Sequence, residues 1–98
     1  MIYMDRTIDS DGKRIADHYG EEIEGNQLIE EMAELIQAIN KHRRYRDQVT
    51  MYHLHEETAD VLATLERYAY LVGIDDSIVQ QIIGEKNARE LRRIHEDK

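Results

Sequence analysis

The stretch QLIEEMAELIQAINKHRR, residues 27–44, carries the periodicity that decides the fold. Its aliphatic side chains recur every three or four positions, which is the spacing of one face of an α-helix. The cations that follow, in KHRRYR at residues 41–46, stand where a helix dipole favours positive charge. We therefore predict a helix over residues 27–44 with an inward-facing apolar stripe, formed by Leu28, Met32, Leu35 and Ile39 and widened by Ile29 and Ile36.

Two neighbouring segments also have helical patterns. KRIADHYG, residues 13–20, predicts a short helix that Gly20 ends, because glycine is favoured just past helix C-termini. A longer helix is predicted from about residue 50 to residue 71 or 72, and Gly73 is its expected C-cap. The side chains expected to face inward from this helix are Leu54, Val61, Leu65, Tyr68 and Val72.

The last segment predicts a further amphipathic helix, DSIVQQIIGEKNARELRRI over residues 76–94, which starts at Asp75 or Asp76. No strand-like alternation is long enough to compete, and the absence of proline together with the short connections favours antiparallel neighbours. We predict an all-α antiparallel bundle of three long helices and one short N-terminal helix. A single domain is expected over residues 1–98, beginning with an irregular segment over residues 1–12.

Composition limits the classes of function. The chain has no cysteine, which excludes disulfides, thiolate chemistry and Cys-ligated zinc. No apolar run reaches membrane-spanning length and none resembles a signal peptide, so we expect a soluble, cytoplasmic protein without a membrane partner. The formal net charge of −8 argues against nucleic acid as the main ligand, because such binding depends on basic groups. A small phosphorylated ligand would need a divalent cation to neutralise the acids locally.

An acidic pattern occurs twice, in EEMAEL at residues 30–35 and in EETADV at residues 56–61. Glu31 and Glu34 are three positions apart, as are Glu57 and Asp60, so each pair emerges on one side of its helix, beside the apolar stripe. If the two helices pack antiparallel, the four carboxylates converge at a half-buried seam, where unpaired acids are costly. Four oxygen donors suit Mg²⁺ first and Mn²⁺ second, although two solvated acidic faces would give the same spacing.

The combination of Glu31-x-x-Glu34, a gap of 22 residues and Glu57-x-x-Asp60 resembles the signature of the MazG-like superfamily of all-α nucleoside triphosphate pyrophosphohydrolases. The resemblance runs from about residue 15 to residue 93 and is closest to small single-domain members of the phage and Gram-positive type. It implies Mg²⁺-dependent hydrolysis of a (deoxy)nucleoside triphosphate between the α and β phosphates. The four acids would be the catalytic metal ligands, and the protein would form a homodimer or homotetramer.

The same resemblance assigns polar residues of the last helix. Family members carry a basic residue there that reaches the phosphates, and Lys86 and Arg89 match that role best. Asn87 is placed near the apolar seam, as a ligand contact or as a core amide bonded to the backbone. Glu90 departs from the family pattern, because many relatives have Asn or Arg at this position, and it puts the phosphate contacts in doubt.

Other polar residues near the acidic motifs are weaker candidates. Gln27, one turn before Glu31, shares the predicted metal side and could touch a base or sugar. His53 stands where some relatives have lysine, and is either a phosphate contact or an ordinary exposed histidine. Glu30 and Glu56 are alternative ligands or bases that orient the water, or simply solvated acids. The basic run at residues 41–46 either attracts nucleotide or is a solvated helix end.

Two other functions fit the same pattern. Phosphoribosyl-ATP pyrophosphohydrolase belongs to the same superfamily, although its usual flanking sequence fits this chain less well. A non-catalytic oligomerisation or regulatory module could have kept the helical scaffold and lost the chemistry. The wide apolar stripes leave surface uncovered in a bundle this small, which itself favours a homo-oligomer.

Overall fold

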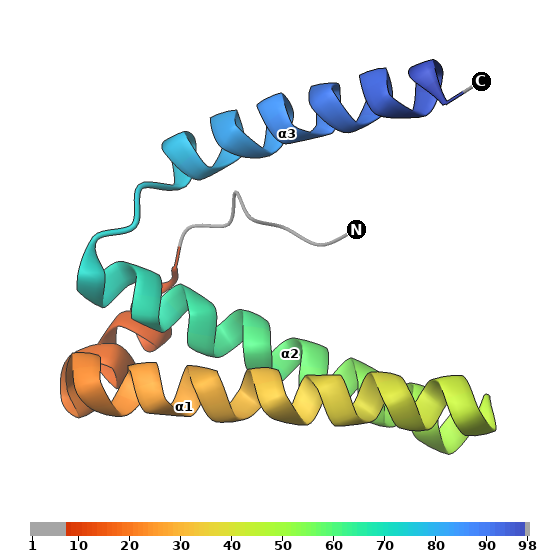
Figure 1. Ribbon diagram of the computed structural model, residues 1–98. Coiled ribbons are helices and arrows are strands. Elements are labelled where there is room, and N and C mark those ends of the chain that lie inside the picture. The colour runs from red at the N-terminus through yellow and green to blue at the C-terminus, as the bar shows by residue number, and fades with distance from the viewer. Residues whose placement is uncertain (1–7, 98) are drawn as a thin grey trace. The chain divides into compact units, whose positions relative to one another are not determined.

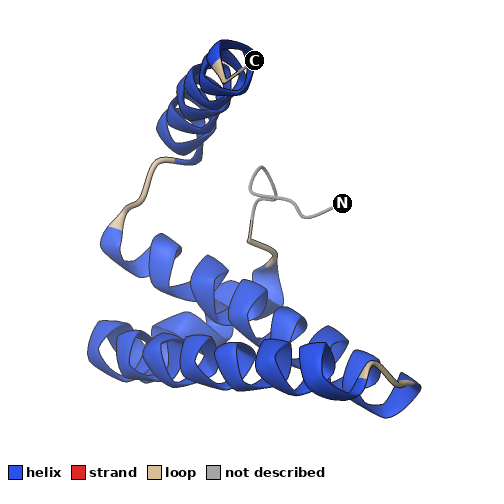
Figure 2. Ribbon diagram, turned by 45° about the vertical axis from the view of Figure 1, so that its right-hand side comes forward, coloured by secondary structure: helices blue, strands red, loops and turns tan. Residues whose placement is uncertain are grey.

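The computed structural model describes residues 8–97, which contain α-helices and no strand (Figure 2). The three helices are α1 (Ser10–Tyr45), α2 (Gln48–Val72) and α3 (Asp76–Glu96), as Figure 1 shows. The predicted all-α class is confirmed. Within the described residues, no helix combines the length and the apolar character needed to cross a membrane.

The chain divides into two compact units, described here one at a time. The first, residues 8–73, is a hairpin in which α1 and α2 lie side by side and run antiparallel (Figure 1). The second contains α3, and residues 1–7 of the predicted irregular segment lie outside the described part of the chain. The single domain over residues 1–98 stays a prediction.

Helix α1 is interrupted by a sharp kink. It starts at Ser10, before the predicted residue 13, and Asp9 caps it by accepting a hydrogen bond from the Gly12 N–H at 2.8 Å. At Gly20 the backbone leaves helical geometry with φ 84° and ψ 172°, a conformation that glycine adopts without a side-chain clash. The short helix predicted over residues 13–20 is therefore the first part of α1. Residues 21–26, which we had not assigned to a helix, continue α1 beyond the kink.

The turn between the two helices is fixed by reciprocal capping. The Thr50 N–H donates to Asp47 Oδ1 at 2.8 Å, and the Asp47 N–H donates to Thr50 Oγ1 at 3.3 Å. His42 Nδ1 lies 2.9 Å from the same Thr50 hydroxyl and so ties the end of α1 to the start of α2. Helix α2 starts slightly earlier than predicted and ends at Val72, where Gly73 adopts the predicted left-handed cap with φ 80°.

The most buried positions of the α1–α2 hairpin include both apolar and polar side chains. Met32 and Ile39, predicted to face inward, are 43% and 42% exposed, which corrects the expected packing of the stripe. The reason is that the aliphatic residues of α1 cover more of its circumference than one partner helix can bury. The buried positions are Ala16, Glu24, Leu28, Glu31 and Ala38 on α1, with Thr50 and Thr64 on α2.

One glycine marks a close approach of the two helices. A Cβ added at Gly25 would lie 3.0 Å from Tyr68 Cε1, which is closer than an ordinary van der Waals contact. The missing side chain therefore lets the Tyr68 ring pack directly on the α1 backbone. On α2, Leu54, Val61, Leu65 and Tyr68 are half-buried as the pattern predicted, whereas Val72 is exposed.

Helix α3 begins as predicted, with Asp75 as its N-cap. The Asp75 carboxylate accepts a hydrogen bond from the Ser77 N–H at 2.9 Å, and its bonds with Ser77 lower the pKa of Asp75. The helix extends to Glu96, slightly beyond the predicted residue 94. No residue of α3 is buried, and its aliphatic side chains Ile78 and Leu91 are 54% and 67% exposed.

Candidate metal centre

Acids from both helices of the hairpin meet at the middle of the α1–α2 interface. Glu31 comes from α1, whereas Glu57 and Asp60 come from α2. One carboxylate oxygen of each lies within 4.8 Å of the others, which is close enough for all three to contact one ion. The antiparallel packing thus produces the convergence that the repeated motif suggested.

Burial makes this cluster different from a solvated acidic patch. Glu31 is only 8% exposed and Glu57 is half-buried, while Asp60 is exposed at the mouth of the cluster. The Oε2 atoms of Glu31 and Glu57 are both buried, and neither has a hydrogen-bond partner within the described residues. A buried carboxylate oxygen without a donor is costly, so these two atoms call for a positive partner.

Glu34, the fourth predicted acid, is exposed and does not belong to the three-acid group, but its charge acts on that group. Burial raises the pKa of Glu31, the Gln27 hydrogen bond opposes that shift, and the charges of Asp60 and Glu34 add to it. Burial also raises the pKa of Glu57, and Glu34 is the next cause. The negative charge of Glu34 thus helps to raise the pKa of both Glu31 and Glu57, while the structure brings together only three of the four predicted ligands.

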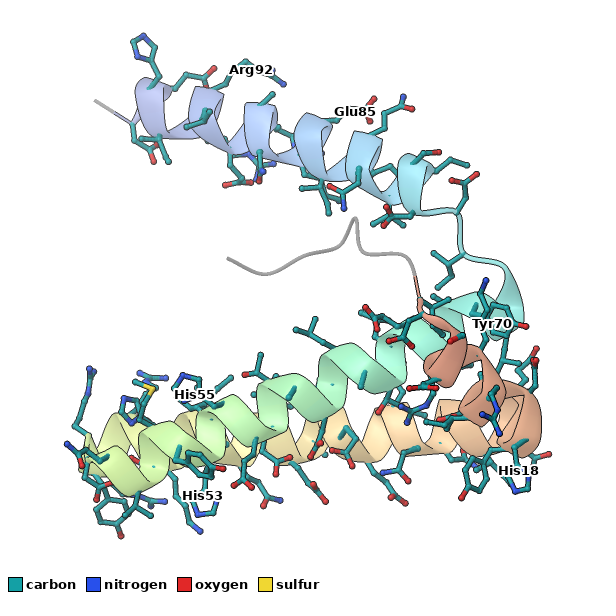
Figure 3. All side chains as sticks on the ribbon, turned by 180° about the vertical axis from the view of Figure 1, so that it is seen from behind. His18, His53, His55, Tyr70, Glu85 and Arg92 are labelled. Atoms are coloured by element: carbon teal, nitrogen blue, oxygen red, sulfur yellow. The ribbon has the colours of Figure 1, made fainter. Side chains whose placement is uncertain are left out.

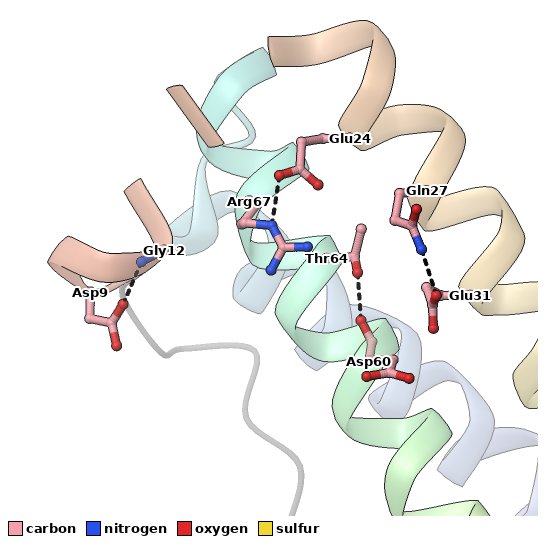
Figure 4. Close-up of polar contacts among 8 residues, drawn as sticks. All are labelled: Asp9, Gly12, Glu24, Gln27, Glu31, Asp60, Thr64 and Arg67. Atoms are coloured by element: carbon pink, nitrogen blue, oxygen red, sulfur yellow. Dashed lines mark hydrogen bonds and ion pairs between the residues drawn. The ribbon is translucent and has the colours of Figure 1, made fainter. Parts of the chain in front are cut away.

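Two polar residues support the cluster from within the hairpin (Figure 4). Gln27 Nε2 donates to Glu31 Oε1 at 2.6 Å, so this amide holds one oxygen of the carboxylate and leaves Oε2 free. Thr64, only 2% exposed, donates its hydroxyl to the backbone carbonyl of Asp60 at 2.6 Å. The structure thus engages Gln27 with a cluster acid, where the sequence suggested contact with a base or sugar.

A second charged position lies farther along the same interface, and sequence reasoning missed it. Arg67 Nε on α2 donates to Glu24 Oε2 on α1 at 2.7 Å (Figure 4). The Glu24 side chain is 2% exposed and that of Arg67 is 19% exposed. Glu24 precedes Glu31 by two helical turns, and Arg67 follows Asp60 by two turns. This spacing is the signal that could have identified the pair.

The remaining candidates are exposed, and none of them belongs to the three-acid group. His53 Nδ1 lies 3.2 Å from Glu56 Oε1, and both side chains are about half exposed on α2 (Figure 3 labels His53). Glu30 is exposed. Lys86, Asn87 and Arg89 are exposed on α3 in the second unit, so their predicted contacts with phosphate stay predictions.

The donor set limits which ion this centre could hold. All four side chains offer carboxylate oxygens, the ligands that hard divalent cations such as Mg²⁺ and Mn²⁺ prefer. The chain has no cysteine thiolate, and no histidine belongs to the cluster of described acids. The two unpaired buried oxygens fit a small dication held between the helices.

Comparison with family models, with curated proteins and with solved structures finds no match for this chain. The MazG-like resemblance therefore rests on the motif residues and their spacing. The geometry of the acidic centre is an independent observation, because it depends on the packing of α1 against α2.

Proposed function

We propose that this chain is a Mg²⁺-dependent nucleotide pyrophosphohydrolase of the MazG-like type. It would hydrolyse a (deoxy)nucleoside triphosphate between the α and β phosphates and release a monophosphate and pyrophosphate. The observation that supports this function best is the meeting of Glu31, Glu57 and Asp60, with two buried oxygens that no donor satisfies. Mn²⁺ is the alternative ion.

The ion would be held by Glu31, Glu34, Glu57 and Asp60. Bound Mg²⁺ offsets the negative charge of the phosphates and of the leaving pyrophosphate. Gln27 keeps Glu31 turned so that its unpaired oxygen stays available, because the amide occupies the other oxygen. Glu57 and Asp60 lie within helix α2, and a helix positions ligand side chains more precisely than a loop does.

The reaction needs no covalent nucleophile from the protein. Water attacks the α phosphorus, and a cluster carboxylate accepts the proton that the water loses. The bond from the α phosphorus to the bridging oxygen breaks as the new bond forms, and pyrophosphate leaves with the electron pair. This chemistry agrees with a chain that offers carboxylates and has no cysteine.

Phosphate binding would fall to Lys86, Arg89 and Asn87 of α3. Lys86 and Arg89 are three positions apart and both exposed, so they share one side of that helix. Their positive charge supports the assignment, because the nucleotide brings several negative charges to a protein whose formal net charge is −8. His53 is a weaker candidate, since Glu56 already engages it.

The proposed enzyme is a homodimer or homotetramer. Ile29 and Ile36 lie two turns apart on α1 and are 64% and 61% exposed, with Met32 and Ile39 half-exposed beside them. An aliphatic stripe of this kind is typical of a surface that another protein chain covers. Sedimentation at micromolar concentration should give a dimer or tetramer, and a monomer would contradict the assembly.

The test is Mg²⁺-dependent release of pyrophosphate from a panel of nucleotides. We expect Glu31→Gln and Asp60→Asn each to lower kcat/KM by about 10²–10³-fold, the size of effect seen when a group that stabilises transition-state charge is removed. The matched control is Glu22→Gln, which neutralises an exposed acid on the same helix as Glu31. Its activity should stay within about two-fold of the wild type.

The other outcomes separate the alternatives. Release from phosphoribosyl-ATP alone would select that substrate in place of a nucleoside triphosphate. No release from any nucleotide with Mg²⁺ or Mn²⁺, from a protein that is helical by circular dichroism, would favour the non-catalytic module. Activity that Glu31→Gln and Glu22→Gln affect equally would exclude the acidic cluster as the catalytic centre.

A further inference from the structure

Positive charge is distributed unevenly over this acidic protein. Lys41, Arg43, Arg44 and Arg46 lie within six consecutive positions that contain no acid. The next acid, Asp47, accepts the Thr50 N–H as the N-cap of α2, and no further acid occurs before Glu56. These four cations, together with Tyr45 and Tyr52, are called the basic tip below.

The basic tip occupies the end of the hairpin where α1 turns into α2 (Figure 1). His53 and His55 lie on the adjoining part of α2, as Figure 3 shows. All four cations are exposed, and none of them forms an ion pair within the described residues. Arg67 contrasts with them, because the fold itself engages that cation with Glu24.

Exposed aromatic rings accompany these cations. Tyr45 and Tyr52 are 60% and 64% exposed, and Arg44 Cζ lies 5.4 Å from the centroid of the Tyr45 ring. Tyr52 and Arg46 also line an open hollow of about 620 Å³ at the turn. A second hollow of about 530 Å³ is lined by Asn40, Arg43 and Arg44. The surface therefore offers cations without ion pairs among the described residues, the exposed Tyr52 ring, a Tyr45 ring with Arg44 over one face, and space beside them.

We propose that the basic tip binds single-stranded nucleic acid. Proteins that bind single strands combine cations along the phosphate backbone with aromatic side chains on which unpaired bases stack. The cations of residues 41–46 would contact the phosphates, and Tyr45 and Tyr52 would stack on bases. A duplex would engage the cations but not the rings, because its bases are already stacked.

The overall negative charge does not oppose this local binding strongly. Net charge predicts that nucleic acid is not the main ligand, but that argument treats the charge as uniform. Glu34, the acid of the metal centre nearest to the tip on α1, precedes Lys41 by about two turns, or roughly 10 Å along the helix. At physiological salt, charges act over about 8 Å, so the acidic cluster is largely screened from the basic tip. Asp47, which follows Arg46 and lines the same hollow, is the acid that opposes phosphate binding locally, against four cations.

The experiment measures binding of a fluorescein-labelled twelve-nucleotide oligo(dT) by fluorescence anisotropy, with EDTA present so that no dication bridges DNA to the acidic cluster. With up to four phosphate contacts, the slope of log K against log salt should be about −3, at roughly −0.7 for each contact on a single strand. Arg43→Glu/Arg44→Glu should weaken binding at least about ten-fold, because it removes two phosphate contacts and adds repulsion.

Two further variants distinguish binding at the basic tip from an effect of net charge alone. Lys13→Glu/Arg14→Glu makes the same change in net charge at the start of α1, where both residues are exposed, and should alter binding less than about two-fold. Tyr52→Leu should weaken binding by about ten-fold, since it removes a stacking ring and no charge. Circular dichroism checks that each variant keeps its helical content.

Several outcomes would overturn the proposal. These are no binding at 50 mM salt, an equal loss in both charge variants, and no loss in Tyr52→Leu. Polyglutamate or duplex DNA binding as tightly as oligo(dT) would show a general polyanion site in its place. None of these results bears on the proposed hydrolysis, which is measured separately with Mg²⁺ and the cluster variants.

Discussion

Two positions in the α1–α2 interface each bury a glutamate, but they give its carboxylate different partners. At one position, Glu24 is buried and Arg67 of the opposite helix donates to it at 2.7 Å. At the other, two turns away, Glu31 is buried and faces Glu57 and Asp60. The first acid has an internal counter-charge, whereas the second has a neutral amide, Gln27, and two further acids.

The two buried acids therefore differ in the partners that the fold gives them. For Glu24, the hairpin supplies an arginine from the opposite helix as a counter-charge. At Glu31 it supplies only the Gln27 amide and leaves Oε2 of Glu31 and of Glu57 without a donor. These unsatisfied buried oxygens are the observation on which the proposed dication site rests.

The largest effect on stability is expected when the Glu24–Arg67 ion pair is disrupted. Arg67→Met should lower the free energy of unfolding by about 3 kcal/mol, because it leaves Glu24 buried without its counter-charge. Urea unfolding followed by circular dichroism measures the change. The double variant Glu24→Leu/Arg67→Met should recover most of the loss, since two apolar side chains replace the ion pair. A single variant as stable as the wild type would show that the pair does not support the fold.

The unpaired position should respond to a dication. At ten times its dissociation constant, Mg²⁺ should raise the free energy of unfolding by about 1.4 kcal/mol through preferential binding to the folded state. The melting temperature with and without EDTA reports this. Asp60→Asn should weaken the response and Glu22→Gln should not, because only Asp60 belongs to the cluster. An equal response in both variants would place the ion elsewhere.

Without metal, removing one charge from the cluster should stabilise the hairpin. Glu31→Gln keeps an acceptor for the Gln27 amide and removes the repulsion from Asp60 and Glu34. We expect a gain of a few tenths of a kcal/mol in EDTA, the usual size for a like-charge pair on helices. This opposes in sign the effect of breaking the Glu24–Arg67 pair. Destabilisation by Glu31→Gln would mean that the carboxylate is a structural group.

The smallest expected effect is a change of metal-free stability with pH. Folding raises the pKa of Glu31 and Glu57 above the ordinary value of 4.5, so the folded state binds protons more tightly than the unfolded state. Their contribution is fully present below pH 4.5 and is lost as pH rises through the raised pKa values. The lowered pKa values of Asp47 and Asp75 act in the opposite direction in more acidic solution. Comparison of the wild type with Glu31→Gln across pH therefore isolates the cluster, and identical profiles would contradict it.

The sequence predicted those elements that local signals define. The cap at Gly73 and the start of α3 after Asp75 follow from single residues with strong positional preferences. The periodicity of α1 predicted the helix and half of its inward stripe, since Leu28 is buried and Leu35 is half-buried. The other half is exposed because the aliphatic residues of α1 exceed what one partner helix covers. Met32 and Ile39 are exposed for that reason, while Glu31 is buried.

The site was predictable only in part. Two acidic motifs with the same spacing indicated that carboxylates of neighbouring helices meet, since i, i+3 pairs share a face. The Glu24–Arg67 pair stands seven residues from Glu31 on α1 and seven from Asp60 on α2, but this spacing identifies it only once α1 is known to pack against α2. The contact of Gln27 with Glu31 lies within one turn, but choosing between it and a substrate contact required side-chain positions.

The kink at Gly20 also affects the order in which the chain can fold. Contacts across the hairpin span a growing length of chain, from 8 residues between His42 and Thr50 to 43 between Glu24 and Arg67. Beyond Gly20, the redirected start of α1 lets Asp17 accept the Tyr70 hydroxyl at 3.2 Å, across 53 residues. Because loop-closure entropy rises with that span, the hairpin should form from the turn outward, with the Asp17–Tyr70 contact last. Amide hydrogens of the first turns of α1 should then exchange with solvent faster than those near Thr50.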